Sequence, residues 1–155
     1  MPSLRAITPD DFETIRRHRL AMFREGGRPA VAIAAMAEPF GLWLRPRLDD
    51  GRYFGWIAQG DGGEVAAGIG MMEIDWPPHW LHPTTGRRGY VLNLYVEPQY
   101  RRRGLARRMV AAAMDEGRAR GLEYMILHPS EQGRPLYESL GWSPTGELGI
   151  AVPKA

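Results

Sequence analysis

The fold is decided by residues Val91–Ala106, with the sequence VLNLYVEPQYRRRGLA. The first six residues, apolar except for Asn93, predict a buried strand, and the proline and arginines that follow predict a turn. A helix then runs to about residue 120 and ends at Gly121, because glycine adopts the left-handed conformation that closes helices without steric cost. In such a strand, turn and helix, the first amides of the helix lack backbone partners and suit an anion.

The residues of this turn favour a bulky, multiply charged anion. Gly104 has no side chain, so the backbone can approach the ligand closely, and Ala106 keeps the next contact position small. Positive charge is concentrated around the turn, on Arg101, Arg102, Arg103, Arg107 and Arg108. The sequence therefore predicts a diphosphate site rather than a solvated arginine turn.

Two motifs in this order resemble those of a known family. The spacing Arg-x-x-Gly-x-Ala at 101–106 is similar to the acetyl-CoA signature of the Gcn5-related N-acetyltransferase (GNAT) family. Downstream, residues 130–142, SEQGRPLYESLGW, resemble the family's closing motif, in which a small helix ends in Leu-Tyr-Glu-x-x-Gly-Phe. The resemblance extends over residues 4 to 150. Ser130, Gly133 and Trp142 stand where many members carry asparagine, alanine and phenylalanine, which leaves the contact of Ser130 open.

The resemblance implies a mixed α/β (α+β) fold that binds acetyl-CoA. The implied central sheet is mostly antiparallel, has helices on both faces, and contains one parallel strand pair that splays apart to admit the pantetheine arm. Tyr137 matches the family tyrosine whose hydroxyl approaches the CoA sulfur, so it either protonates the leaving thiolate or only packs. The implied cofactor-binding residues are Leu94, Tyr95, Val96, Arg101, Arg102, Arg103, Gly104, Leu105, Ala106, Arg107, Ser130, Gly133 and Tyr137.

Composition limits the class of protein. A chain of 155 residues, 44% hydrophobic and 25% charged, fits one domain over residues 1–155, with no apolar run long enough to cross a bilayer. The N-terminus lacks the apolar segment of a secretory signal, so we expect a cytoplasmic protein. Because there is no cysteine, we expect direct attack by the acceptor rather than a cysteine acyl-enzyme. No residue spacing indicates a metal site, and a net charge of +2 is too small to indicate a nucleic-acid partner.

Periodic apolar patterns predict a mixed sheet. The short strands early in the chain are bounded by glycines and predict antiparallel hairpins, while the strands on either side of the helix at 104–120 predict a parallel pair. The predicted strands are 4–7, 53–58, 65–75, 91–96, 123–127 and 145–152.

The N-terminal half also predicts helices. The segment Thr8–Asp11 has the pattern of a capping box with proline at the first helical position. A second helix over 30–37 is expected to be interrupted by Pro39 and Gly41, and residues 42–48 resume the helix or stay irregular. Several apolar residues here form an acceptor pocket or plain core, and core is the preferred interpretation, for Met22, Phe23, Met36, Phe40 and Trp43.

Glu73 and Asp75 are the candidates for the general base. They share one face of a strand near its end, where a carboxylate can take a proton from the amine through water. The alternative is a pair of solvated charges at a strand end. Asn93 points toward the acceptor or satisfies a bulge, and the glycines at 68 and 70 permit a bulge or leave room for a ligand.

The histidines receive no catalytic role from the sequence. His79 and His82 lie in a loop rich in aromatic residues and proline and are expected to be exposed. His18 is predicted to be a surface residue, and Glu97 an exposed charge of the turn. His128 follows a buried strand, at a position that can border the cofactor channel.

These patterns favour an enzyme, an acyltransferase that moves an acetyl group from acetyl-CoA to a primary amine of a small molecule or peptide. A non-catalytic acyl-CoA-binding or sensor protein of the same fold is the alternative, because no residue is firmly assigned as the base. Apolar residues at 42–57 and 142–152 are compatible with a homodimer.

Overall fold

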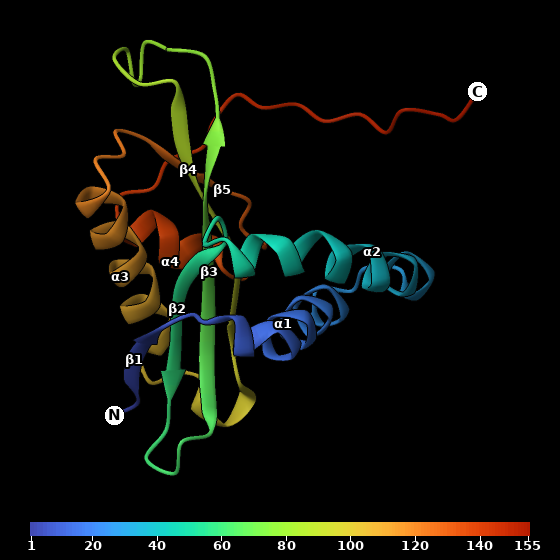
Figure 1. Ribbon diagram of the computed structural model, residues 1–155, viewed down its shortest axis with the longest axis vertical. Coiled ribbons are helices and arrows are strands. Elements are labelled where there is room, and N and C mark those ends of the chain that lie inside the picture. The colour runs from blue at the N-terminus through green and yellow to red at the C-terminus, as the bar shows by residue number, and fades with distance from the viewer.

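A five-stranded sheet with helices on both faces makes up the computed structural model, which describes all 155 residues (Figure 1). Neighbouring strands are antiparallel except for the last pair, which is parallel. The predicted class, a mixed and mostly antiparallel sheet with one parallel pair, is therefore confirmed. In order across the sheet the strands are β1 (Ser3–Ala6), β2 (Phe54–Gln59), β3 (Val65–Asp75), β4 (Arg87–Val96) and β5 (Met125–Leu127).

The helices form two layers (Figure 1). One face of the sheet is covered by α1 (Phe12–Glu25) and α2 (Ala30–Asp49). The other is covered by α3 (Leu105–Ala119) and α4 (Arg134–Ser139). Two short 3₁₀ turns, η1 (Pro9–Asp11) and η2 (Pro98–Tyr100), precede α1 and α3.

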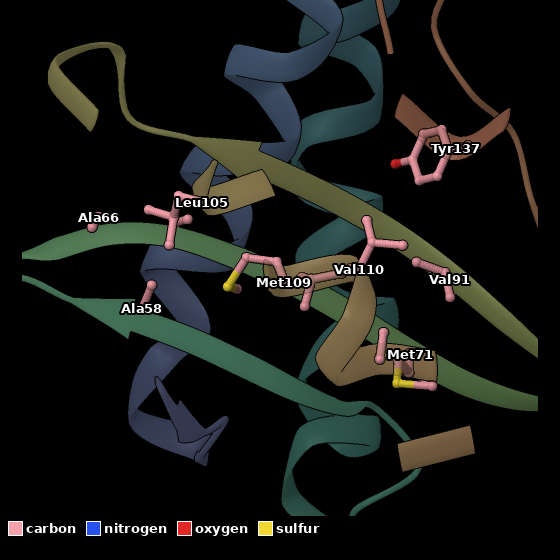
Figure 2. Close-up of a cluster of buried hydrophobic side chains, with 11 residues drawn as sticks. Ala58, Ala66, Met71, Val91, Leu105, Met109, Val110 and Tyr137 are labelled. Carbon is pink, nitrogen blue, oxygen red and sulfur yellow. The ribbon is translucent and has the colours of Figure 1, made fainter. Parts of the chain in front are cut away.

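Each layer of helices buries its own apolar cluster against the sheet. Figure 2 shows the larger one, which lies between α3 and the strands and includes Val91, Met109 and Tyr137. The smaller cluster lies beneath α1 and α2, where Phe40 and Leu44 are buried and Met36 and Trp43 pack against it. Core is thus the correct interpretation for these α2 residues. Because both faces of the sheet are buried, its central strands are apolar on both sides.

The start of α1 is tied to β1. The backbone amide of Thr8 donates to the Asp11 carboxylate at 2.8 Å, as a capping box requires. The same buried carboxylate accepts two hydrogen bonds from the Arg5 guanidinium, at 2.7 and 2.8 Å. The predicted capping pattern is confirmed, and the bidentate ion pair fixes where α1 leaves the sheet.

The predicted interruption of the second helix is wrong. α2 is continuous from Ala30 to Asp49, although Pro39 and Pro46 lie within it. Each proline removes only one hydrogen bond of the helix, and the buried face that contains Phe40 and Leu44 continues on both sides of Pro39. Tertiary packing therefore outweighs the local cost of the prolines.

A β-bulge interrupts the pairing of β3 with β4. Gly68 pairs with Tyr95 and Gly70 with Leu92, so two residues of β4 face one residue of β3. Asn93 lies in this bulge with a left-handed φ of 56°. The two glycines leave room for side chains rather than for a ligand. A Cβ at Gly68 would lie 3.0 Å from the His18 ring, and one at Gly70 would overlap the Tyr53 hydroxyl.

The predicted last strand over 145–152 is wrong. The chain has no regular secondary structure after Gly141, and Figure 1 shows its C-terminal end extending away from the sheet. The apolar side chains of this segment are 96%, 89% and 85% exposed at Leu148, Ile150 and Val152. Their alternation suits a strand, but a strand also needs a neighbour for its backbone hydrogen bonds, and this segment pairs with none of the five strands.

Candidate active site

The turn between β4 and α3 presents backbone amides to its surroundings. Arg102 and Gly104 adopt left-handed conformations, with φ of 58° and 76°, and turn the chain into the helix. The amides from Arg102 to Arg107 donate to no acceptor within the protein. They lie at the N-terminus of a 15-residue helix, whose dipole adds positive potential. The arrangement suits a phosphate or diphosphate.

Arg101 points away from this turn. Its guanidinium pairs with Glu25 at the end of α1, at 2.8 Å, and its Nε donates to the Val96 carbonyl at 2.9 Å. The side chain therefore links the end of α1 to the end of β4. Its contacts give Arg101 a structural role beside the cofactor-binding role that the family motif implies.

The other arginines of the turn divide into two groups. Arg107 donates to a hydroxyl of α4, and Arg108 to a carbonyl near the N-terminus. Arg102 and Arg103 are exposed and form no ion pair; Arg103 packs over the Tyr100 ring, 5.9 Å from its centre. Arg102 and Arg103 are thus the cations free to approach an anion at this turn.

The parallel strands β4 and β5 separate after Val91, next to the bulge of β4. β5 pairs with β4 only from Gly89 to Val91, so the following residues of β4 have an open edge. The amide of Glu97 donates to Ala66 at 2.9 Å, which places the backbone groups of Val96 on the open edge and those of Tyr95 toward β3. Leu94 alternates with Tyr95 and shares the open edge. The Val96 carbonyl accepts from Arg101, which leaves its amide free.

Tyr137 reaches the separated strands from α4. Its ring packs in the cluster that contains Val91, and Figure 2 shows the hydroxyl pointing away from α4. Burial raises the pKa of this hydroxyl to about 12, so it holds its proton at neutral pH. Ser130 caps the turn before the helix: its Oγ accepts the Gly133 amide at 3.0 Å. Tyr137 is therefore a protonated group beside the open edge of β4.

Glu73 and Asp75 lie elsewhere. Glu73 is opposite Gly89 and forms ion pairs with Arg87 and with Arg120 at the end of α3. Asp75 is exposed at the end of β3, opposite Arg87. By register both residues precede the point where β4 and β5 separate. The structure does not bring either carboxylate together with Tyr137.

A polar cluster occupies the other face of β4. Arg19 of α1 donates to the Asn93 side-chain oxygen at 2.7 Å, and the Asn93 amide donates to the Tyr53 hydroxyl at 2.9 Å. Next to it, the Tyr90 hydroxyl lies 3.0 Å from Nδ1 of His128. Sequence reasoning missed Arg19, Tyr53 and Tyr90. The polar residue at position 93 of an apolar strand was its only signal, and the structure shows that Asn93 both occupies a bulge and faces this cluster.

His128 is linked to the C-terminal segment. Its Nε2 lies 3.2 Å from the Glu147 carboxylate, so Glu147 favours the tautomer that carries its proton on Nε2. Nδ1 is then free to accept the Tyr90 proton. The result is a chain of three polar groups, from Tyr90 through His128 to Glu147, that begins where β5 ends.

The sequence predicted His18 and Glu97 to be surface groups, and this prediction is wrong. His18 is 1% exposed, and its Nε2 lies 3.0 Å from the Glu97 carboxylate, which also pairs with Arg17 at 2.6 Å. Burial lowers the pKa of His18, although Glu97 opposes the effect. His82 was expected to be exposed, but it is buried, and its Nε2 accepts from the buried Arg88 at 2.9 Å. The sequence does not reveal the contact between His18 and Glu97 because it depends on packing between distant segments.

Comparison with known proteins identifies the family of this chain. The model of the acetyltransferase (GNAT) family matches residues 12–142, so the chain belongs to that family. The predicted resemblance is confirmed, and the class of protein is acetyltransferase. A search of curated proteins gives no match. No helix has the length and apolar character needed to span a bilayer.

Solved structures of the same family are similar over nearly the whole chain. A GCN5-related N-acetyltransferase from Ralstonia eutropha JMP134 is 49% identical, with 98% of this chain and 99% of that chain covered and a TM-score of 0.96. A predicted acetyltransferase from Clostridium acetobutylicum, solved with acetyl-CoA, is 26% identical, with coverage of 98% and 96% and a TM-score of 0.85. A ribosomal-protein-alanine N-acetyltransferase from Brucella melitensis, 19% identical, covers 98% and 99% with a TM-score of 0.66 and shares the fold.

Proposed function

We propose that the protein is a cytoplasmic N-acetyltransferase that moves the acetyl group of acetyl-CoA to a primary amine of a small molecule or peptide. The observation that carries the proposal is the row of unpaired amides from Arg102 to Arg107, which leads directly from the open edge of β4. These amides would bind the diphosphate of acetyl-CoA, and the free backbone groups of Leu94 and Val96 would pair with its pantetheine arm. The acetyl-CoA in the relative from Clostridium acetobutylicum supports the choice of donor.

Acetyl-CoA supplies an activated thioester, and residues of this chain would donate and accept the protons that the transfer requires. Tyr137 holds its proton at neutral pH and would donate it to the departing thiolate. The amine must lose a proton to attack. The Tyr90 hydroxyl can accept that proton while it passes its own to Nδ1 of His128. We favour this chain over Glu73 and Asp75, because Glu73 is held in ion pairs with Arg87 and Arg120, and Asp75 is exposed at the far end of β3.

Direct attack in a ternary complex fits the residues present. The chain has no cysteine, so no cysteine acyl-enzyme can form. Tyr137 and Tyr90 belong to opposite faces of the sheet, since Tyr137 packs in the cluster under α3 while Tyr90 pairs with Met72, which packs under α1 and α2. Donor and acceptor could therefore approach the edge of β4 from different sides.

Thermal unfolding and thiol release test the proposal. Acetyl-CoA and CoA should both raise the unfolding temperature more than ATP, because only they fill the pantetheine site as well as the phosphate site. Thiol release from acetyl-CoA should then depend on one class of amine. Stabilisation by both CoA species without release for any amine would contradict the enzyme and support a non-catalytic sensor. No stabilisation at all would contradict both.

A homodimer is also part of the proposal. The exposed side chains of Leu148, Ile150 and Val152 alternate as in a strand, and β5 has a neighbour on one side only. The occupant that fits the free edge of β5 is the 145–152 segment of a second copy, which would bury these side chains. Light scattering should give a dimer, and deletion of residues 144–155 should give a monomer. A full-length monomer would contradict this arrangement.

A further inference from the structure

Arg19 is a partly buried cation without an acidic partner. Two neighbours on α1 are paired, Arg16 with Glu13 and Arg17 with Glu97, whereas no carboxylate lies within ion-pair distance of Arg19. Arginine remains charged at neutral pH even when it is partly buried. Buried charges in proteins are normally paired, so the environment of Arg19 favours an anion that the chain itself does not supply.

The guanidinium of Arg19 is held in one position. It lies between two aromatic rings, 4.9 Å from the centre of Phe23 and 4.7 Å from that of Phe40. Its Nη1 donates to Asn93 at 2.7 Å, and Asn93 is fixed in turn by the buried Tyr53 hydroxyl. A group positioned in this way loses little conformational entropy when it binds a ligand.

One edge of the guanidinium is unused. Its Nε is buried without a hydrogen-bond partner, and its Nη2 donates to no protein atom. Nε and Nη2 lie side by side, and carboxylates bind such a pair with two parallel hydrogen bonds. A carboxylate at Nη2 would neutralise the charge, and a turn of the guanidinium would bring the buried Nε to the same ligand.

The position of Arg19 relates it to the acceptor. Its partner Asn93 lies two residues beyond Val91, the last residue of β4 that pairs with β5. The nearby phenols do not neutralise the cation, because burial raises the pKa values of Tyr53 and Tyr90. Glu25 and Glu97 are already paired with other arginines.

We propose that the acceptor is an amine that also carries a carboxylate, and that Arg19 binds this carboxylate. The inference rests on the proposed function and adds a substrate class to it: amino acids, or peptides that present a carboxylate close to the reacting amine. Arg19 is then a specificity residue and takes no part in proton transfer. A neutral amine of the same shape lacks the charge that pairs with the guanidinium.

A binding experiment tests the proposal without turnover. The probes are product-like N-acetylglycine, N-acetylleucine and N-acetylphenylalanine, each compared with its carboxamide, which has nearly the same shape and no charge. Titrations with and without CoA should give at least one carboxylate that binds about tenfold or more tightly than its carboxamide, as expected for charge-assisted hydrogen bonds. Arg19→Met should lose this preference, and Arg19→Lys should retain part of it.

Arg24→Met is the matched control, because Arg24 is exposed on the same helix and its loss changes the net charge equally. It should keep the preference for carboxylates. Equal binding of carboxylate and carboxamide by the wild type, or equal loss in both methionine variants, would overturn the proposal. Turnover adds a second comparison: Arg19→Met should raise KM for amino acids and leave KM for acetyl-CoA unchanged.

Failure of the proposed function gives a different result. A protein that does not bind CoA would contradict the acetyltransferase mechanism, yet the titrations without CoA would still compare carboxylate with carboxamide at Arg19. A protein that binds CoA and acetylates neutral amines as well as amino acids would retain the proposed function and overturn this inference alone.

Discussion

The two faces of β4 are built by different means. On the face toward α3, the groups available to a ligand are mainly backbone amides of one continuous segment, 102–107, with Tyr137 as the added side chain. On the face toward α1, they are side chains brought together from four parts of the chain, such as Arg19, Tyr53, Asn93 and His128. Backbone groups change little when side chains are substituted. Substitutions can therefore change the face toward α1, the proposed acceptor face, while the face toward α3, the proposed cofactor face, keeps its geometry.

The largest expected effect tests the side chain of the cofactor face. Tyr137→Phe removes the proposed acid and should lower kcat about 100-fold, the lower end of the usual range for general acids. The affinity for CoA should stay nearly the same, because the ring still packs. Stopped-flow turnover and calorimetric titration measure the two quantities. Tyr100→Phe is the control, since that hydroxyl contacts Glu64 on the surface; equal turnover in both variants would remove Tyr137 from the mechanism.

The backbone of the cofactor face is tested by Gly104→Ala. Gly104 has a φ of 76° and no protein atom within 4 Å of an added Cβ, so the protein should lose only about 1–2 kcal/mol from the left-handed conformation. The methyl group should weaken CoA binding about 30-fold, because it keeps the diphosphate from the amides. Gly63→Ala has the same surroundings and a φ of 84° in a distant hairpin, and should lose stability without losing CoA affinity. Calorimetry that gave the same CoA affinity for both variants would place the diphosphate elsewhere.

The acceptor face should respond less to a single change in its proton-transfer chain. His128→Gln should lower kcat about tenfold, less than the usual effect of a general base, because Tyr90 and water can still carry the proton. Tyr90→Phe should have a similar effect, and the double variant should be no worse than either single one, since both act in one chain. His79→Gln serves as a control on the loop. Additive losses in the double variant would separate the roles of Tyr90 and His128.

This difference between the faces also explains what could be predicted from the sequence. The turn at 98–104 and the capping box at Thr8 were predicted because neighbouring residues along the chain determine them. His18 was missed because its burial depends on Gly68, a residue of another element that leaves space for the ring. Arg19 was missed for the same reason, since its partners lie on α2 and β4.

Where the sequence prediction failed on secondary structure, the cause was again long-range packing. The helix α2 continues past Pro39 because Phe40 and Leu44 are buried under it, and this burial is not visible in local propensity. The segment 145–152 has the alternation of a strand, but it pairs with no strand of the sheet. Periodicity predicts which apolar residues could be buried, whereas tertiary packing determines which of them are buried.

The smallest expected effect concerns how α1 is held against the sheet. His18 links α1 to Glu97, and burial lowers the pKa of its imidazole in the folded protein. As pH falls, the unfolded chain therefore takes up this proton first, so the contribution of His18 to stability is complete above about pH 6.5 and is lost below it. Glu97 titrates at lower pH: burial raises its pKa, but the hydrogen bonds from Arg17 and His18 outweigh that effect.

Hydrogen exchange can localise this effect. Between pH 7.5 and about pH 5.5, corrected for the intrinsic rates, protection of α1 should fall while protection of α3 stays constant, because His18 lies on α1 and burial lowers the pKa of its imidazole. His18→Gln keeps a donor for Glu97 and cannot titrate, so it should remove the pH dependence of α1. An equal fall in α1 and α3 would mean that the two helix layers open together, and would contradict a local effect of His18 on α1.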